Sequence, residues 1–226
     1  MENHRTLIGD IQTALRNERP SFHGQTAAGT RNWSIGPEIL NWMEINIPRG
    51  AHTLETGCGY STVVLSSLAG SHTVVAPFSQ EHALIKKWCD NHGVPMDHVN
   101  FIAKRSQEVL PQLGVDDLGF VLIDGDHAFP IPFIDFYYTA EKIRKGGFIA
   151  VDDTQIRTGQ ILRDFLDKEA GRWHLAAEVG KTAIFERTTD APVITDIRWM
   201  KQEYCKIPRK TLIHKIEAKL SRLIRN

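Results

Sequence analysis

The sequence predicts one α/β domain, in which a mostly parallel β-sheet is covered by helices on both faces. Short apolar runs alternate with helical segments from residue 52 to residue 169, which is the pattern of strand-helix-strand units. Glycines follow several of these runs and mark turns between them. The length of 226 residues suits a single domain with terminal extensions.

Each expected element follows from this alternation. The strands are expected at 52–56, 72–76, 99–103, 120–124, 148–153, 173–179 and 181–187. The helices between them are expected at 61–69, 80–93, 106–113, 133–147 and 156–169. Gly93 closes one helix and Gly146 with Gly147 stops another, while the last two strands pair across a tight Gly-Lys turn. An antiparallel hairpin should therefore form one edge of the sheet.

The chain divides into three expected regions. Residues 1–50 read as a helical cap in which two helices flank a polar loop, with Ser34 as N-cap and Pro37 in the first turn of the second helix. Residues 51–190 form the α/β domain, and residues 191–226 form a basic amphipathic extension.

Composition favours an ordinary globular protein, with 42% apolar and 24% charged residues. No segment reaches the roughly 20 apolar residues that span a bilayer. The charged N-terminal segment lacks the apolar core of a signal peptide, and the three cysteines lack metal-ligand spacing. These features predict a cytoplasmic setting.

The net charge of zero is unevenly distributed. Residues 197–226 carry nine Lys or Arg against two Glu, and apolar residues recur there at helical spacing. This basic helix would pack on the domain or on a second subunit, or rest on an anionic membrane surface at the inner face of the membrane. Nucleic acid is a weaker expectation because no recognition motif accompanies the charge.

A glycine turn follows the first strand of the α/β domain. Glu55 ends the strand, Gly57 and Gly59 form the turn, and Ser61 opens a helix. Glycines let the backbone approach a ligand, and a helix N-terminus offers free N–H groups. A dinucleotide fingerprint would need a third glycine where Thr62 stands, and a plain tight turn is the alternative.

This turn resembles motif I of the class I S-adenosylmethionine-dependent methyltransferases, over about residues 50 to 188. The resemblance implies a Rossmann-like, doubly wound, mostly parallel seven-stranded sheet with an antiparallel edge hairpin. It also implies S-adenosyl-L-methionine as the cofactor, with its methionine part held by Glu55, Gly57, Gly59 and Ser61.

The second strand departs from the family pattern, because it lacks a terminal acidic residue for the ribose hydroxyls. Ser79 or Gln80 would substitute for it, or Glu81 would reach back. After the third strand, Ser106 and Gln107 lie where the family often contacts adenine.

Three carboxylates end the next two strands. Asp124 follows the fourth strand, and Asp152 with Asp153 follows the fifth, so all should meet at the carboxyl edge beside the cofactor. Such close carboxylates repel one another unless a cation neutralises them, and oxygen ligands suit Mg²⁺, Mn²⁺ or Ca²⁺. The sequence therefore predicts a divalent metal site, with Mg²⁺ favoured.

The pattern Asp124-x-x-His127 followed by an adjacent acidic pair resembles metal-dependent small-molecule O-methyltransferases, and most of all the macrolide-sugar enzymes. That resemblance implies His127 as general base. Asp126 is read as a turn residue. Alternatively, His127 would only bond its own loop and Asp153 would only cap a helix.

The expected function is O-methylation of a hydroxyl on a small molecule or glycan, with a sugar favoured. One alternative is an NAD-dependent oxidoreductase, although the third glycine is missing. The other is a non-catalytic Rossmann-like module that docks on membrane or nucleic acid through its basic tail.

Overall fold

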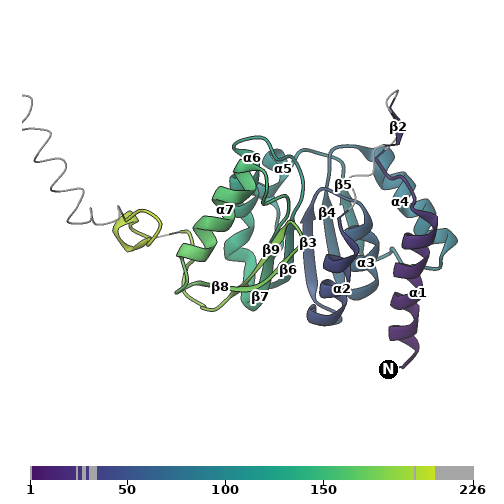
Figure 1. Ribbon diagram of the computed structural model, residues 1–226, viewed down its shortest axis with the longest axis horizontal. Coiled ribbons are helices and arrows are strands. Elements are labelled where there is room, and N and C mark those ends of the chain that lie inside the picture. The colour runs from purple at the N-terminus through teal and green to yellow at the C-terminus, as the bar shows by residue number, and fades with distance from the viewer. Residues whose placement is uncertain (1, 24, 27–28, 31–34, 196, 207–226) are drawn as a thin grey trace, which may run out of the picture.

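A seven-stranded sheet forms the centre of the computed structural model, which describes residues 2–23, 25–26, 29–30, 35–195 and 197–206 (Figure 1). Its strand order is β5-β4-β3-β6-β7-β9-β8, and the first five strands in that order run parallel. The antiparallel hairpin of β8 and β9 continues the sheet beyond β7. The bounds are β3 His52–Thr56, β4 Ser71–Val75, β5 Val99–Ile102, β6 Leu118–Ile123, β7 Ile143–Val151, β8 Trp173–Val179 and β9 Thr182–Arg187.

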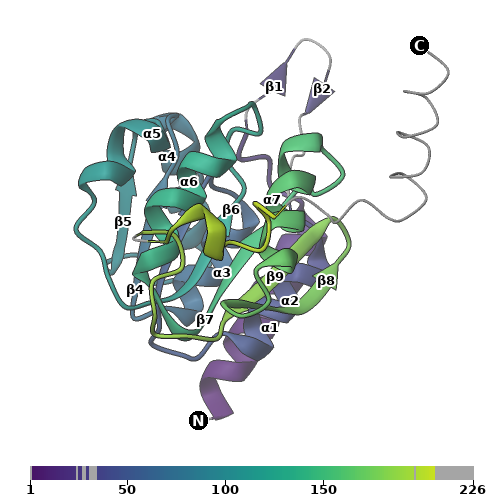
Figure 2. The same ribbon diagram turned by 90° about the vertical axis from the view of Figure 1, so that its left-hand side faces the viewer.

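Helices cover both faces of this sheet, and Figure 2 shows α5, α6 and α7 in front of it. One apolar core joins α1 to α4 to one face, and a second core joins α5 to α7 to the other. Because both faces are buried, every residue of the central strand β6 is buried. The helices are α1 Glu2–Glu18, α2 Pro37–Asn46, α3 Tyr60–Leu68, α4 Ser79–Asn91, α5 Ser106–Val109, α6 Ile131–Thr139 and α7 Arg157–Lys168. Short 3₁₀ turns are η1 Leu110–Gln112, η2 Ala140–Lys142 and η3 Trp199–Lys201. A separate antiparallel pair joins β1 Gln25–Thr26 to β2 Gly29–Thr30.

The predicted fold class is confirmed, including the edge hairpin and its turn at Gly180 and Lys181. Pro37 occupies the first turn of α2 as expected. The predicted Ser34 cap is wrong, because Gly36 is the N-cap residue of α2. Ser34 itself lies outside the described residues.

The helix expected at 133–147 ends early. Helix α6 stops at Thr139, and β7 already begins at Ile143. Pairing shifts between Leu118↔Ile143 and Phe120↔Phe148, so the β7 side holds extra residues that bulge. Gly146 lies in this bulge at φ 77°, a conformation that favours glycine. Pairing with β6 thus outweighed the helical propensity of the charged residues before the glycines.

The basic helix predicted near the C-terminus lies outside the described residues, and the three-region division stays a prediction. Within the described part of the chain, no helix combines the length and apolarity needed to cross a bilayer.

Candidate active site

Three loops meet at the carboxyl ends of β3, β6 and β7. The backbone N–H of Asp124 donates to Thr56 O at 3.1 Å, and that of Asp152 donates to Ile123 O at 3.0 Å. Parallel pairing therefore continues one residue past the strands and fixes where each loop begins. As a result, the glycine turn and the acidic residues lie side by side, as the sequence predicted.

Gly57 makes the closest contact between these loops. Its φ is 92°, and a Cβ at this position would lie 2.2 Å from Asp124 O. Its N–H donates to Val75 O at 3.0 Å, which ties the turn to the end of β4. A residue with a side chain cannot occupy this position without moving the loop.

Glu55 supports the glycine turn from beneath. Its carboxylate is fully buried and accepts hydrogen bonds from Ser61 Oγ at 2.6 Å and Thr62 Oγ1 at 2.5 Å. His72 Nε2 lies 3.1 Å from the same carboxylate. The side chains of Glu55 and Ser61 thus bond each other under the turn, and their predicted contact with the cofactor stays a prediction.

A second contact crosses the turn from α4. Glu81 Oε2 accepts from Cys58 Sγ at 3.4 Å, and Glu81 Oε1 lies 3.3 Å from His23 Nδ1. Glu81 thus reaches back over the turn, while Ser79 and Gln80 are exposed at the start of α4. Which of the three would contact the ribose stays a prediction. The sequence reading did not connect His23 with Glu81, since no local pattern links two residues so far apart.

Ser106 and Gln107 are half-buried at the start of α5. Beneath them lies Asp135 of α6, a buried carboxyl that the sequence reading missed. Burial raises the pKa of Asp135 to about 6, although interactions with the hydroxyls of Ser106 and Thr56 lower it. Neither Asp135 oxygen has a hydrogen-bond partner of good geometry.

Asp124, His127 and Asp153 form the acidic centre of the site. One ligand atom from each lies within 4.8 Å of the other two, close enough to share a metal ion. His127 Nε2 lies 2.9 Å from Asp153 Oδ2. Asp153 has φ 52°, an uncommon backbone conformation for a non-glycine residue. The donor set of two carboxylates and an imidazole fits a divalent ion.

Asp152, which the sequence also predicts as a metal ligand, lies outside this three-residue group, and its role as a ligand stays a prediction. Its carboxylate is buried and accepts a hydrogen bond from Thr182 Oγ1 at the start of β9. Lys181 Nζ lies 3.5 Å from Asp152 Oδ2 and also bonds Asp153 Oδ1. The sequence predicts only a turn at Lys181, because its side chain meets the acids through the pairing of β9 with β7.

The carboxyls have different pKa values for physical reasons. Burial raises the pKa of Asp124 well above its usual range, and the charges of Asp152 and Asp153 raise it further. Burial by itself would raise the pKa of Asp153, but hydrogen bonds from Lys181 and Gln155 have the larger combined effect. The pKa of Asp153 is therefore lowered. Near neutral pH, Asp153 is therefore the charged partner of His127.

The loop that carries His127 is held at both ends. Asp126 Oδ1 accepts from Ala128 N at 2.9 Å, which agrees with the turn role expected for Asp126. Thr158 Oγ1 of α7 donates to His127 O at 2.7 Å. The imidazole thus projects from a fixed backbone.

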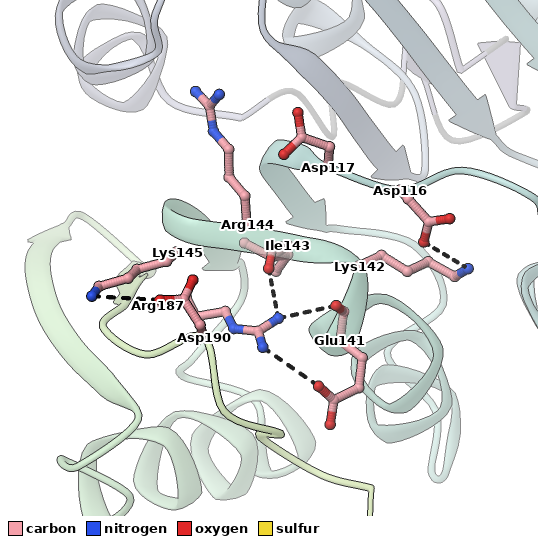
Figure 3. A pocket seen from close by; sticks show the side chains of 9 residues that line it. All are labelled: Asp116, Asp117, Glu141, Lys142, Ile143, Arg144, Lys145, Arg187 and Asp190. Carbon is pink, nitrogen blue, oxygen red and sulfur yellow. Dashed lines mark hydrogen bonds and ion pairs between the residues drawn. The ribbon is translucent and has the colours of Figure 1, made fainter.

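A separate cavity of about 270 Å³ lies at the opposite, amino-terminal edge of the strands (Figure 3). Its wall includes Arg187, whose guanidinium donates to Ile143 O at 2.6 Å and Glu141 O at 3.0 Å. Charges of both signs pair with one another across it, as between Lys145 and Asp190. Because the charged side chains of its wall pair with one another, we assign this cavity a structural role.

Comparisons with known proteins agree with this geometry. Residues 54–154 match the model of a family described as a methyltransferase domain, whereas comparison with curated proteins gave no match. Among solved structures, the cofactor-bound protein Rv0187 from MTB is 18% identical with a TM-score of 0.59, covering 77% of this chain and 89% of its own. The O-methyltransferase TomG from Streptomyces achromogenes, involved in tomaymycin synthesis and solved with SAM, is 17% identical with a TM-score of 0.56 (81% and 90% covered). An rRNA methylase from Streptococcus thermophilus is 10% identical with a TM-score of 0.53 (69% and 99% covered).

At these identities the solved structures show the shared fold, and the family model covers the glycine turn, Asp124, His127 and both terminal acids of β7. Together with the strand order and the site at the carboxyl edge, these findings show that residues 54–154 are similar to a methyltransferase domain and that the chain has the fold of these methyltransferases.

Proposed function

We propose that this protein is an S-adenosylmethionine-dependent methyltransferase that transfers a methyl group to a hydroxyl of a small molecule or glycan, with a sugar favoured, and that His127 is the general base. The observation that carries the proposal is the 2.9 Å contact between His127 Nε2 and Asp153 Oδ2 beside the glycine turn. A neutral sugar hydroxyl is a weak nucleophile at neutral pH, so it needs a base in reach. The site offers an imidazole on a fixed loop.

The roles of the side chains follow from their charges. S-adenosylmethionine supplies a methyl group on a positively charged sulfur. The hydroxyl proton moves to the His127 ring as the acceptor oxygen bonds the methyl carbon, and the electron pair of the broken carbon–sulfur bond stays on sulfur. Asp153 then stabilises the imidazolium, because its own pKa is lowered and it remains negative.

We also propose that a divalent ion, with Mg²⁺ favoured, assists at Asp124, Asp153 and the adjacent Asp152. Such an ion, when bound, lowers the pKa of a hydroxyl that it contacts. The donor set supports this, since Asp124 and Asp153 offer ligand atoms within 4.8 Å of each other. Asp124 itself must lose the proton that its raised pKa favours.

The cofactor would lie over the glycine turn. Gly57 and Gly59 leave the backbone without side chains in front of the N-terminus of α3. Glu81 extends across that turn, and Ser106 with Gln107 begins α5 after strand β5. We propose Glu81 as the ribose partner in place of Ser79 or Gln80, because its carboxylate already lies against Cys58 of the turn.

Calorimetric titration with S-adenosylhomocysteine tests the cofactor, and a screen of sugar and phenolic acceptors with labelled S-adenosylmethionine tests the reaction. We expect micromolar binding and methylation of a hydroxyl that stops in His127→Ala. Absence of binding would contradict the methyltransferase function. Methylation only at nitrogen would contradict the O-methyl assignment, and methylation only of RNA would contradict the small-molecule or glycan acceptor. Either result would leave the cofactor assignment standing.

A further inference from the structure

The turn between β8 and β9 is attached directly to the acidic loop after β7. Lys181 O accepts hydrogen bonds from both Thr154 N at 2.9 Å and Thr154 Oγ1 at 2.8 Å. The next residue, Thr182, donates to Asp152. Two hydrogen bonds to the Lys181 carbonyl and one from the Thr182 side chain thus hold the turn against residues 152–154, which fixes the point from which the Lys181 side chain starts.

The Lys181 side chain extends inward from this point. Its Nζ bonds Asp153 Oδ1 and lies 3.5 Å from Asp152 Oδ2. The Asp152 and Asp153 side chains are only 2% and 13% exposed, whereas that of Lys181 is 46% exposed. The ammonium group therefore lies on carboxylates that are largely shielded from water, although nearly half of the Lys181 side chain is exposed to solvent.

Charge balance explains the position of this ammonium group. Asp152 and Asp153 are adjacent, and the charges of both raise the pKa of Asp124. Carboxylates this close and this buried repel one another strongly unless a cation lies between them. Lys181 supplies that cation from within the chain. A divalent metal ion would need the same carboxylate oxygens.

We propose that Lys181 is a built-in counter-cation that occupies the cation position between Asp152 and Asp153 and has to withdraw before a divalent ion can bind there. It thereby sets the metal affinity of the site. This inference rests on the proposed function only in the assignment of the metal to these carboxylates. Because the Lys181 side chain is 46% exposed, it can withdraw into solvent.

The test is Mn²⁺ binding to the full chain, followed by electron paramagnetic resonance of free Mn²⁺ and by calorimetry. We expect Lys181→Met to bind Mn²⁺ at least about tenfold more tightly than the wild type, since the charge of a site is a main determinant of its metal affinity. Lys181→Arg keeps the charge and should stay near the wild type. Lys145→Met is the matched control, because Lys145 pairs with Asp190 far from the site.

A second measurement needs no metal in the reference state. Without Mn²⁺, Lys181→Met should melt at a lower temperature than the wild type, because the carboxylates lose their counter-cation, and Mn²⁺ should restore the loss. Unchanged or weaker Mn²⁺ binding by Lys181→Met, including no binding at all, would overturn the proposal. Parallel titration of the wild type with S-adenosylhomocysteine separates this failure from failure of the proposed function. Only an absence of S-adenosylhomocysteine binding by the wild type would count against the proposed function.

Discussion

His127 and Asp153 lie 2.9 Å apart between Nε2 and Oδ2, although they follow different strands of the sheet. The contact exists because β6 and β7 are parallel neighbours, with Ile123 paired to Val151. It places an imidazole beside a carboxylate that is negative at neutral pH. This arrangement is suited to proton transfer and is the basis of the first prediction.

His127→Ala should lower the rate of methyl transfer by about 10²- to 10⁴-fold, because that is the usual contribution of a general base. The affinity for S-adenosylhomocysteine should stay within about threefold, since His127 is not part of the glycine turn. Single-turnover kinetics and calorimetry measure the two effects. His174→Ala, at an exposed position of β8, is the control and should leave both unchanged. A similar loss in both variants would remove the assignment.

Glu55→Ala should destabilise the fold by about 3 kcal/mol or more, because it leaves buried donors on Ser61, Thr62 and His72 without their acceptor. It should also weaken S-adenosylhomocysteine binding as the turn loosens. Urea unfolding gives the first quantity and calorimetry the second.

Glu178→Ala is the comparison for Glu55. Glu178 pairs with Arg163 on the surface, where an ion pair contributes only about 1 kcal/mol or less. Equal unfolding free energies for the two variants would show that the buried network does not support the turn.

Gly57→Ala should prevent cofactor binding and destabilise the protein. The added Cβ would meet Asp124 O at 2.2 Å, and the φ of 92° is unfavourable for alanine. Gly114→Ala is the matched control, because a Cβ there meets nothing within 4 Å. Binding of S-adenosylhomocysteine by Gly57→Ala at wild-type affinity would contradict the close packing of the glycine turn on the acidic loop.

Asp135→Asn should change how stability depends on pH. The folded-state pKa of Asp135, about 6, exceeds the usual 3.8, so its contribution is fully present below pH 3.8 and is lost as pH rises through 6. The shift corresponds to about 3 kcal/mol, because one pKa unit equals about 1.4 kcal/mol.

The Asp135→Asn variant cannot ionise at this position, so its stability relative to the wild type should increase between pH 4 and pH 6 and then level off. Urea unfolding of both proteins across this range measures the difference. A difference that stays constant with pH would mean that Asp135 does not titrate in the folded protein.

The sequence alone determined the order of strands and helices, the edge hairpin and the position of the site. Alternating apolar runs and glycine turns are local signals, and parallel strands necessarily place Asp124, Asp152 and Asp153 at one edge of the sheet. The start of β7 could not be predicted in this way, because pairing with β6 outweighs the helical preference of the residues before Gly146.

Only the tertiary structure decided which side chains face one another. Glu55 lies beneath the glycine turn against His72 of the neighbouring strand β4, and Glu81 of α4 lies across the turn against His23. Lys181 reached the acids because β9 pairs with β7 and returns the hairpin turn to their loop. Contacts of this kind depend on register and packing between distant segments, which local sequence patterns do not encode.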